Sequence, residues 1–475
     1  MPTDPYVFTP CPTSGGDLDL STLRGCAIAD AYARFRAAAG GSVLFAPGLD
    51  SGVARGPLDS LAIGLDWTRA PAAGDPIVER WAQWLIEKLD GAGSIYQRSD
   101  EGWRLRTGKL HEESERRLDE LAGWSDTALA EQRKLLEHVD DPGDSGTELE
   151  QSLSKLAAAG WSVDSKKDKG PPTIHFAAGD LPLAVGDDWR AAGAIHPRLA
   201  AALGFFLAIV PAAERERAQP GQVAALAGRL PATAVVGPDD AAALLDIRTV
   251  AKALRDAGAL DLPSGEPLGT VLERASYRLR AAAGASSPNG AVGSGGADPN
   301  DVGALIDAHG ADAVRLALLH AAAPTKRFRG GDDVVGYAAA FLAQARELAA
   351  SRLDGGAPGE RIDSDDGLRR RLAGWCDTAV ARTTENYEQL DMHRATRNVV
   401  TLLARIGDFD TAVAEDRGDV AGADREAIGV ALTVLARLLA PLAPSAADAL
   451  WRETGRDGSP SDADWPQARQ EPATA

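Results

Sequence analysis

Cysteine is nearly absent from this chain of 475 residues, which contains only Cys11, Cys26 and Cys376. The three lie far apart and form no CxxC pair, so neither a disulfide framework nor a structural zinc site is predicted. Long apolar runs are lacking as well. The best candidate, residues 199–213, is shorter than the roughly 18 residues that a membrane span needs, and it predicts a buried helix instead.

A signal for export is also lacking, and basic residues are fewer than acidic ones. The opening stretch, MPTDPYVFTPCPTSGG, has neither the basic nor the apolar region of a signal peptide, so we expect a cytoplasmic protein with no membrane partner. The chain has 50 Lys and Arg against 69 Asp and Glu, a net charge of −19. An acidic chain repels polyanions, which argues against strong, independent nucleic-acid binding. An acidic composition also fits a high-GC genome or a salt-rich cytoplasm, and this alternative weakens the charge argument against nucleic-acid binding without reversing it.

The length predicts two or three domains, and the N-terminal part alternates strand and helix signals. A strand is predicted at YVFTP, residues 6–10, and a second at residues 41–48. Between them, Leu20, Leu23 and further apolar residues recur at helical spacing, so the order is β-α-β and a parallel sheet is expected. Another amphipathic helix is predicted over residues 75–93, where a Gly closes the pattern.

The rest of the chain changes character twice. Residues 281–300 consist largely of Gly, Ser and Ala and predict a flexible surface loop, whereas the sequence from residue 365 onward contains three long amphipathic helical segments. The predicted fold class is an α/β Rossmann-like domain with an inserted small domain, followed by an all-α helical bundle. The predicted boundaries are 1–137 and 231–350 for the two Rossmann-like halves, 138–230 for the insertion and 351–475 for the bundle.

Motifs in this order resemble the class I aminoacyl-tRNA synthetases, and among them the leucyl-tRNA synthetase branch. FTPCPTSGGDLDLSTLRGCAIADAYARF resembles the family's first signature and the helix after it. GLDWTRAPAAGDPIVERWAQWLIEKLDG, HGADAVRLALLHAAAPTKRF and LLAPLAPSAADALW resemble later segments, the last of them in the family's tRNA-docking bundle. The resemblance implies the class I synthetase fold. The resemblance does not extend to residues 138–230, where the family has a larger editing domain.

The resemblance also implies that the ATP-binding signatures are degenerate. Where the family's first signature has two His, this chain has Asp19 and Thr22. A third ATP-contacting element retains Gly237 and has Asp240 near the ribose position. The signature loop with two Lys falls on neutral residues, among them Gly290 and Gly293. We therefore expect no adenylate chemistry, no catalytic residue, no cofactor and no metal, although Asp19 could either cap the helix or bind a metal or another substrate.

Three further sets of residues leave alternatives open. Asp50 matches the family's acid that holds the amino group of the substrate amino acid, or it is a turn residue. Cys11 stands where the family has a Tyr, and a role as nucleophile is a weaker alternative. Four further residues either form a metal or hydrolytic site or are ordinary surface and core residues: His175, His196, Asp187 and Asp188.

Arginines give the predicted bundle a basic side. They are Arg369, Arg370, Arg371, Arg382, Arg394 and Arg397. We take Arg370 and Arg397 as tRNA-binding candidates, the alternative being that they pair with nearby acids.

The predicted function is a leucyl-tRNA synthetase-like paralogue that binds or regulates without charging tRNA, its partner being tRNA, a genuine synthetase or a small amino acid. The alternative is a leucine–tRNA ligase, or a related ATP-dependent amino-acid-activating enzyme, with a rebuilt ATP site.

Overall fold

The chain forms two compact units. The computed structural model describes residues 5–10, 18–50, 52, 55–72, 74–98, 102–105, 161–164, 173–176, 181–220, 228–237, 240–260, 267–280, 298–353, 356–420 and 422–469. The first unit comprises residues 1–17, 42–53 and 65–274, and the second comprises residues 18–41, 54–64 and 275–475. Among the helices that the structure describes, none is long and apolar enough to cross a membrane.

A parallel sheet lies in the first unit. Its strands, in spatial order, are β2 (Leu44–Ala46), β1 (Tyr6–Phe8), β8 (Ala232–Val236) and β9 (Leu268–Glu273). All three neighbouring pairs are parallel, and β1, β2 and β8 are buried along their whole length. Continuous apolar runs are typical of strands covered on both faces. The predicted β-α-β start and the α/β fold class are confirmed.

Helices pack around this sheet within the first unit. They are α3 (Pro76–Gly91), α6 (Pro197–Leu207) and α9 (Ala241–Asp256). Helix α6 is the buried helix predicted from the apolar run, and its Phe205 ring lies 5.0 Å from Tyr6 and 5.1 Å from Phe8, centre to centre. Residues inside the predicted insertion thus contribute to the core of the sheet. The four-part domain division as a whole stays a prediction.

Antiparallel pairs complete the first unit. Strands β3 (Ile95–Arg98), β4 (Gly102–Leu105) and β7 (Pro182–Ala184) form one small sheet, and β5 (Trp161–Asp164) pairs with β6 (Thr173–Phe176) in another. Gly102 has a φ of +79°, and a Cβ there would lie 2.3 Å from the carbonyl oxygen of Ala184. The close approach of β4 to β7 therefore requires glycine at this position.

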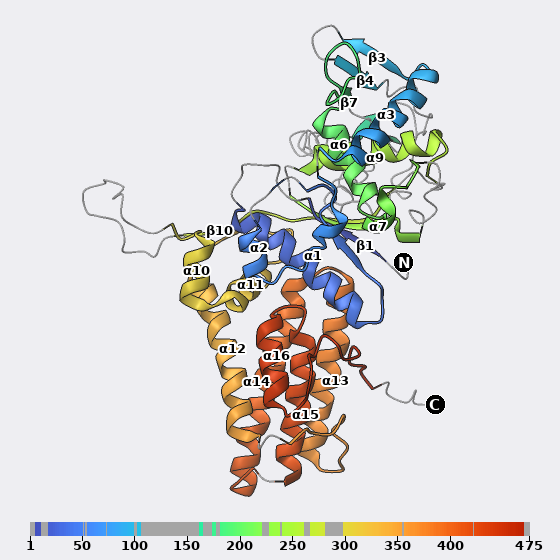
Figure 1. Ribbon diagram of the computed structural model, residues 1–475. Helices are drawn as coiled ribbons and strands as arrows, with labels where there is room; N and C mark the ends of the chain where they lie inside the picture. Colours follow the sequence, from blue (N-terminus) through green and yellow to red (C-terminus); the bar gives the residue numbers. More distant parts are fainter. Residues whose placement is uncertain are drawn as a thin grey trace, which may run out of the picture. The chain divides into compact units, whose positions relative to one another are not determined.

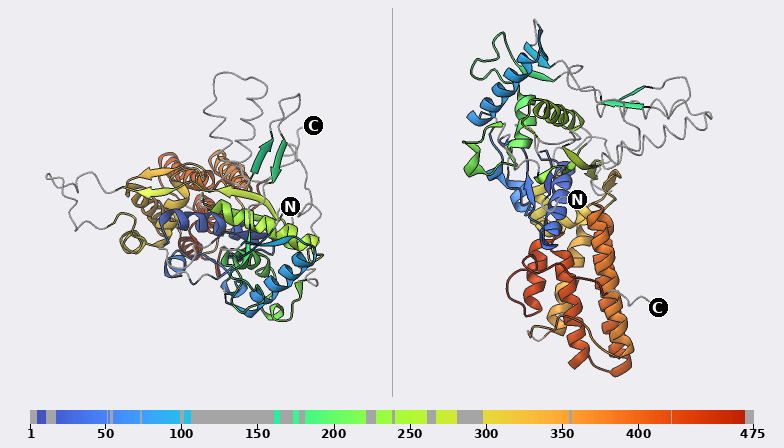
Figure 2. Two further views of the ribbon diagram at one scale, coloured as in Figure 1. Left: turned by 90° about the horizontal axis from the view of Figure 1, so that it is seen from above. Right: turned by 90° about the vertical axis from the view of Figure 1, so that its right-hand side faces the viewer.

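The second unit is mainly helical. Its elements are α1 (Leu20–Ala38), α2 (Gly56–Ser60), α10 (Val302–His309), α11 (Ala311–His320), α12 (Asp333–Arg352), α13 (Gly367–Glu388), α14 (Met392–Arg417), α15 (Gly422–Leu439) and α16 (Pro444–Glu453), with β10 (Tyr277–Leu279) paired in parallel to β11 (Phe328–Gly330). Figures 1 and 2 show the long helices α12 to α15 running alongside one another. The predicted all-α C-terminal bundle is confirmed.

One predicted helix is two helices. The sequence pattern favours a single segment over residues 424–451, but α15 ends at Leu439 and α16 begins at Pro444. Pro441 lies between them, and a proline inside a helix lacks the N–H donor and clashes with the preceding turn. Pro444 is tolerated because it stands in the first turn of α16, where no intrahelical donor is needed.

A buried charge cluster joins α1, α11 and the α15–α16 turn within the second unit. The Asp30 carboxylate accepts from Arg315 Nη2 at 2.5 Å, from Arg34 Nε at 2.7 Å and from the Gly64 N–H at 2.8 Å. Arg315 also donates to the carbonyl oxygens of Leu442, Leu61 and Pro441, at 2.9, 3.2 and 2.8 Å. The Arg315 and Asp30 side chains are 0% and 2% exposed, so their charges are stabilised by each other and by these carbonyls.

Candidate nucleic-acid interface

The first signature position, at the start of α1, carries a carboxylate cap. Asp19 has extended backbone angles, and its Oδ1 accepts a hydrogen bond from the Thr22 N–H at 2.8 Å. An Asp in this position satisfies a backbone donor that the helix cannot satisfy itself. The capping interpretation of Asp19 is confirmed. The same negative charge faces the end of the helix that would otherwise attract an anion.

Ser21 in the same turn has a structural contact. Its hydroxyl accepts from the Tyr277 N–H at 3.0 Å and is also 3.1 Å from the Tyr277 carbonyl oxygen, and Ser21 is 6% exposed. This pair of bonds ties the first turn of α1 to β10. The hydroxyl is therefore committed to the fold rather than available to a ligand.

In the first unit, Asp50 and the Gly237 turn lie at carboxyl ends of sheet strands. The Asp50 Oδ1 accepts from the Gly52 N–H at 3.0 Å, as a turn residue does, and Asp50 has a further interaction. The Asp240 Oδ2 accepts from the Gly237 N–H at 2.6 Å. Their roles toward an amino acid or a nucleotide stay predictions. Gly290 and Gly293 lie outside the described residues.

The structure adds one cation that the sequence analysis overlooked. Arg274 directly follows β9, and a Cβ built on Gly237 would lie 2.8 Å from its Nη2 atom. Glycine at position 237 therefore makes room for this guanidinium beside the turn after β8. The position of Arg274 immediately after a predicted strand was the signal in the sequence, because ligands of parallel sheets bind at the carboxyl ends of strands.

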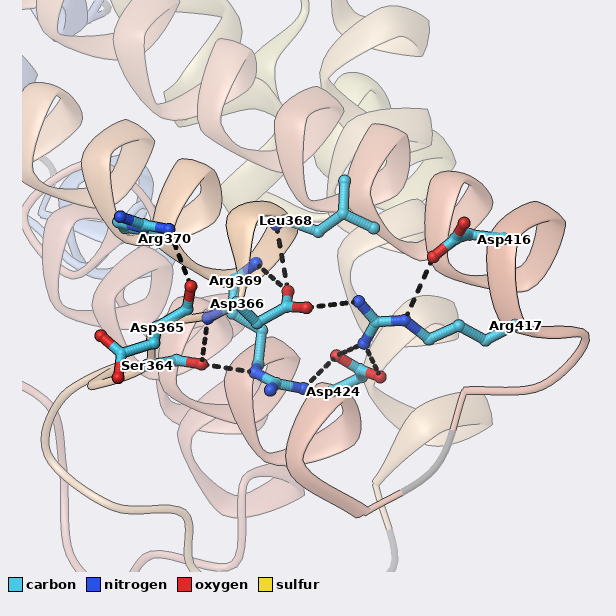
Figure 3. Close-up of polar contacts among 9 residues, drawn as sticks. All are labelled: Ser364, Asp365, Asp366, Leu368, Arg369, Arg370, Asp416, Arg417 and Asp424. Carbon is cyan, nitrogen blue, oxygen red and sulfur yellow. Dashed lines mark hydrogen bonds and ion pairs between the residues drawn. The ribbon is translucent and has the colours of Figure 1, made fainter.

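At the end of the bundle where α13 begins, several arginines pair with acids (Figure 3). Arg417 donates to Asp366 at 2.7 Å and to Asp424 at 2.7 and 2.8 Å, and Arg369 donates to the same Asp424 at 2.8 Å. The backbone N–H of Arg369 and the Arg417 guanidinium lower the pKa of Asp366. Arg369 therefore belongs to an internal ion-pair network, as the alternative interpretation expects.

The two tRNA-binding candidates differ in their surroundings. Arg370 is exposed and donates to the Asp365 carbonyl oxygen at 2.7 Å (Figure 3). Arg397 is exposed on α14, and no ion pair or hydrogen bond engages its guanidinium among the described residues. Because α13 and α14 are joined by a short turn, Arg397 lies beside the second half of α13, about 20 Å along the bundle from Arg370. The two do not form one cluster.

A groove runs between α13 and α14 instead, with a volume of about 170 Å³. The residues that line this α13–α14 groove are Trp375, Thr378, Ala379, Arg382, Asn398, Thr401, Leu402 and Arg405. The Arg405 guanidinium lies 5.2 Å from the centre of the Trp375 ring and also pairs with Asp408 at 3.1 Å. Arg382 is exposed and, within the described ranges, has no ion-pair partner. An aromatic face beside guanidinium groups is suited to stacking a base and neutralising a phosphate.

Of the residues in this groove, Arg382 was predicted from the sequence, whereas Trp375, Asn398 and Arg405 were not. Their signal is spacing: positions 371, 375, 378 and 382 share one face of a helix, as do 394, 398, 401 and 405. Each stripe can be read from the sequence. Their meeting in one groove depends on how α13 packs against α14, which the sequence pattern does not specify.

Of the residues predicted as a metal or hydrolytic site, His196 takes a structural position. His196 caps α6, its Nδ1 accepting from the Arg198 N–H at 3.2 Å, and burial lowers its pKa. Cys26 and Cys376 are buried. In the described ranges, no three His, Cys, Asp or Glu side chains are grouped so that they could hold a metal ion. Cys11 lies outside those ranges.

Sequence comparisons relate the chain to tRNA ligases. Residues 372–475 match the family described as the anticodon-binding domain of tRNA ligase. A leucine–tRNA ligase of Chromohalobacter salexigens is 34% identical over 182 residues, which cover 36% of this chain and 19% of the relative. One of Halobacterium salinarum is 29% identical over 163 residues, covering 34% and 17%. The matched stretch spans about a fifth of the length of these curated relatives.

Comparison of structures extends the likeness of fold to nearly the whole chain. A leucyl-tRNA synthetase of Agrobacterium radiobacter, solved as a ternary complex with tRNA and LeuAMS, matches with a TM-score of 0.67 and 15% identity, over 98% of this chain and 86% of that one. A methionyl-tRNA synthetase of Mycobacterium tuberculosis, bound by methionyl-adenylate, matches with a TM-score of 0.61 and 16% identity, over 94% and 93%. With the parallel sheet and the helical bundle, these structures show that the chain has the fold of class I aminoacyl-tRNA synthetases, and the sequence comparisons show that part of it is similar to leucine–tRNA ligases.

Proposed function

We propose that this chain is a non-catalytic leucyl-tRNA synthetase-like paralogue that binds tRNA through its helical bundle. We infer the loss of catalysis mainly from the Asp19 carboxylate. It caps α1 where the resemblance places a His that faces ATP. An internal anion at this helix terminus opposes a phosphate in two ways. It occupies a backbone donor, and it repels negative charge by about 4 kcal/mol for unit charges 4 Å apart near a protein surface.

Loss of the other signature cations supports the same proposal. The positions aligned with the lysine loop, Gly290 and Gly293 among them, are neutral. Removal of a single oriented donor of this kind typically lowers the rate about 10²- to 10³-fold. Losses at interacting positions do not simply add. Even so, we expect the changes at the first signature and at the lysine loop together to leave adenylate formation far below a useful rate.

The bundle supports tRNA as the partner, ahead of a genuine synthetase or a free amino acid. Its residues 372–475 match an anticodon-binding family, and the α13–α14 groove combines Trp375 with Arg382 and Arg405. Arg397 extends this basic surface along α14. On a chain of net charge −19, such a local surface is needed to offset long-range repulsion of a polyanion.

One observation favours the alternative, an active amino-acid-activating enzyme with a rebuilt ATP site. Arg274 lies beside the Gly237 turn, at the carboxyl ends of β8 and β9. A guanidinium there could take over part of the charge neutralisation that the family assigns to His and Lys. Asp50, which aligns with the family's amino-group ligand, would keep its role in that enzyme.

Amino-acid-dependent ATP–pyrophosphate exchange, measured with each of the standard amino acids, separates the two functions. We expect no exchange above background, and we expect Asp19→His alone to restore none. Leucine-dependent exchange that is lost in Arg274→Ala would refute the proposal and establish the rebuilt site. Arg278→Ala, an exposed position on β10, serves as the matched control.

Filter binding of tRNA at low and moderate salt tests the binding half. We expect affinity to fall steeply with salt, and Arg382→Glu and Arg405→Glu each to weaken binding more than Arg370→Glu does, because Arg382 and Arg405 line the α13–α14 groove and Arg370 does not. Weak binding that is insensitive to salt and to all three charge reversals would exclude the bundle as the tRNA surface.

A further inference from the structure

A second hollow lies on another side of α13, with a volume of about 340 Å³. We call it the α13–α15 cavity, and its lining includes Ile362, Val380, Val430, Val434, Arg437 and Trp465. Its volume falls at the lower end of the range of small-molecule sites in proteins. None of these residues lines the α13–α14 groove, so the two hollows are separate.

The walls of the cavity are fixed by contacts of the C-terminal segment. The Trp465 Nε1 donates to Thr384 Oγ1 at 2.8 Å, and the Trp465 N–H donates to the Ala38 carbonyl oxygen at 3.0 Å. Arg469 pairs with Asp377 at 2.8 Å and closes a further part of the wall. A cavity held in this way is largely formed before a ligand arrives, which lowers the entropy that binding must offset.

The apolar part of the lining suits a branched or aromatic hydrocarbon group. Val380 is buried, and it contributes to the lining with Val430 and Val434. Cys376 is a further buried lining residue, and burial raises the pKa of its thiol to about 12. The thiol is therefore uncharged at neutral pH and acts as one more weakly polar wall group.

The charged lining residues balance in number: Glu360, Asp377 and Asp464 against Arg361, Arg437 and Arg469. Arg437 shares its acid, because Glu360 accepts from Arg437 Nη2 at 3.3 Å and also from Arg456 Nη1, outside the lining, at 2.7 Å. The Nε of Arg437 is buried and has no hydrogen-bond partner among the described residues. A buried donor of a charged group is costly to leave unsatisfied, and an acceptor on a ligand would satisfy it.

Two exposed charged side chains of the α13–α15 cavity are also available to a ligand. Arg361 and Asp464 are exposed lining residues, and in the part of the chain that the structure describes neither side chain has an ion pair or a hydrogen bond. A ligand's carboxylate thus meets Arg437 and Arg361, while an ammonium group on the same ligand would meet Asp464.

We infer that the α13–α15 cavity binds a small monocarboxylate with a branched aliphatic or aromatic body. Simple carboxylic acids and apolar α-amino acids share this chemistry, and Asp464 is the residue that distinguishes them. All the lining residues of the cavity belong to the second unit and none of them lines the α13–α14 groove, so the inference stands whether or not the chain binds tRNA. We expect a ligand of about eight heavy atoms to bind with a Kd of about 1 mM.

Calorimetric titration of the full chain tests the inference with four probes: 4-methylpentanoate, phenylacetate, leucine and phenylalanine. The uncharged control is 4-methylpentanamide. We expect the carboxylates to bind and the amide to bind at least about tenfold more weakly, the factor that one charge-assisted hydrogen bond supplies. If the amino acids bind better and Asp464→Asn removes their advantage, the ligand is an amino acid. Equal affinities assign the simple acid.

Variants complete the test. Val434→Trp fills the cavity and should abolish binding, Arg437→Gln should weaken it about tenfold or more, and the control Arg405→Gln in the groove should leave it unchanged. Absence of binding by all four probes, equal binding of the amide, or binding unaffected by Val434→Trp in a folded variant would overturn the inference.

Discussion

Replacing Asp30 by Asn tests whether buried charges hold α1 in the second unit. The variant keeps the shape of the side chain but removes the charge that Arg315 Nη2 meets at 2.5 Å and Arg34 Nε at 2.7 Å. Arg315 is 0% exposed, so its charge cannot be solvated by water instead. Breaking a buried pair in this way costs about 3–5 kcal/mol, a large share of the stability of a typical domain.

Urea unfolding followed by far-ultraviolet circular dichroism measures the loss. A double variant, Asp30→Leu with Arg315→Met, removes both charges and should lose clearly less free energy of unfolding than Asp30→Asn alone, because no unpaired charge remains. The carbonyls of Leu442, Leu61 and Pro441 would still lose their donor, so we do not expect the free energy of unfolding to return fully to the wild-type value. A loss below about 1 kcal/mol in Asp30→Asn, or an additive loss in the double variant, would refute the reasoning.

The remaining predictions concern the cap, the groove and one histidine. Asp19→Ala should lower the free energy of unfolding by about 1 kcal/mol while Asp19→Asn, which can still cap, should lower it far less; equal losses in thermal melts would argue against the cap. Trp375→Ala should weaken single-stranded RNA binding by about 1–3 kcal/mol per stacked base, whereas Thr378→Ala should not, and unchanged binding by fluorescence anisotropy would remove the groove from the interface. Burial, then His393 and Arg397, lower the pKa of His320 below 6.5, so its contribution to stability is present above that pH and is lost as the pH falls through the lowered value. Acidification should therefore destabilise the wild type more than His320→Phe in urea titrations, and parallel pH profiles would contradict this.

Local signals in the sequence predicted much of the fold. Asp75 before Pro76 marks the start of α3, and the Asp75 Oδ1 does accept from the Ile77 N–H at 3.0 Å. The apolar run around Phe205 gave the buried helix α6. Both depend on residues that are neighbours in the chain, which is where propensity and spacing are informative.

Contacts between distant segments could not be predicted in this way. Arg24 is 0% exposed and donates to the carbonyl oxygens of Leu318 and Ala323, at 3.1 and 2.9 Å, yet in the sequence it is one arginine among many. The partners of Arg315 and the meeting of Trp375 with Arg405 have the same origin. Such pairs are set by how elements pack, so the candidate groove and the cavity beside α15 could be found only in the structure.

The cap at Asp19 has a consequence for the evolutionary history of this chain. Its hydrogen bond to the Thr22 N–H stabilises α1. Under the proposed function, replacement of a phosphate-facing His by Asp at this position would have added stability as it removed a ligand contact. Asp19→His would exchange a carboxylate, which the positive end of the helix dipole favours, for an imidazole, the kind of cap that His196 provides on α6. A lineage that acquired Asp19 would thus regain phosphate binding only through intermediates that are less stable and, while the aligned lysine-loop positions stay neutral, still inactive.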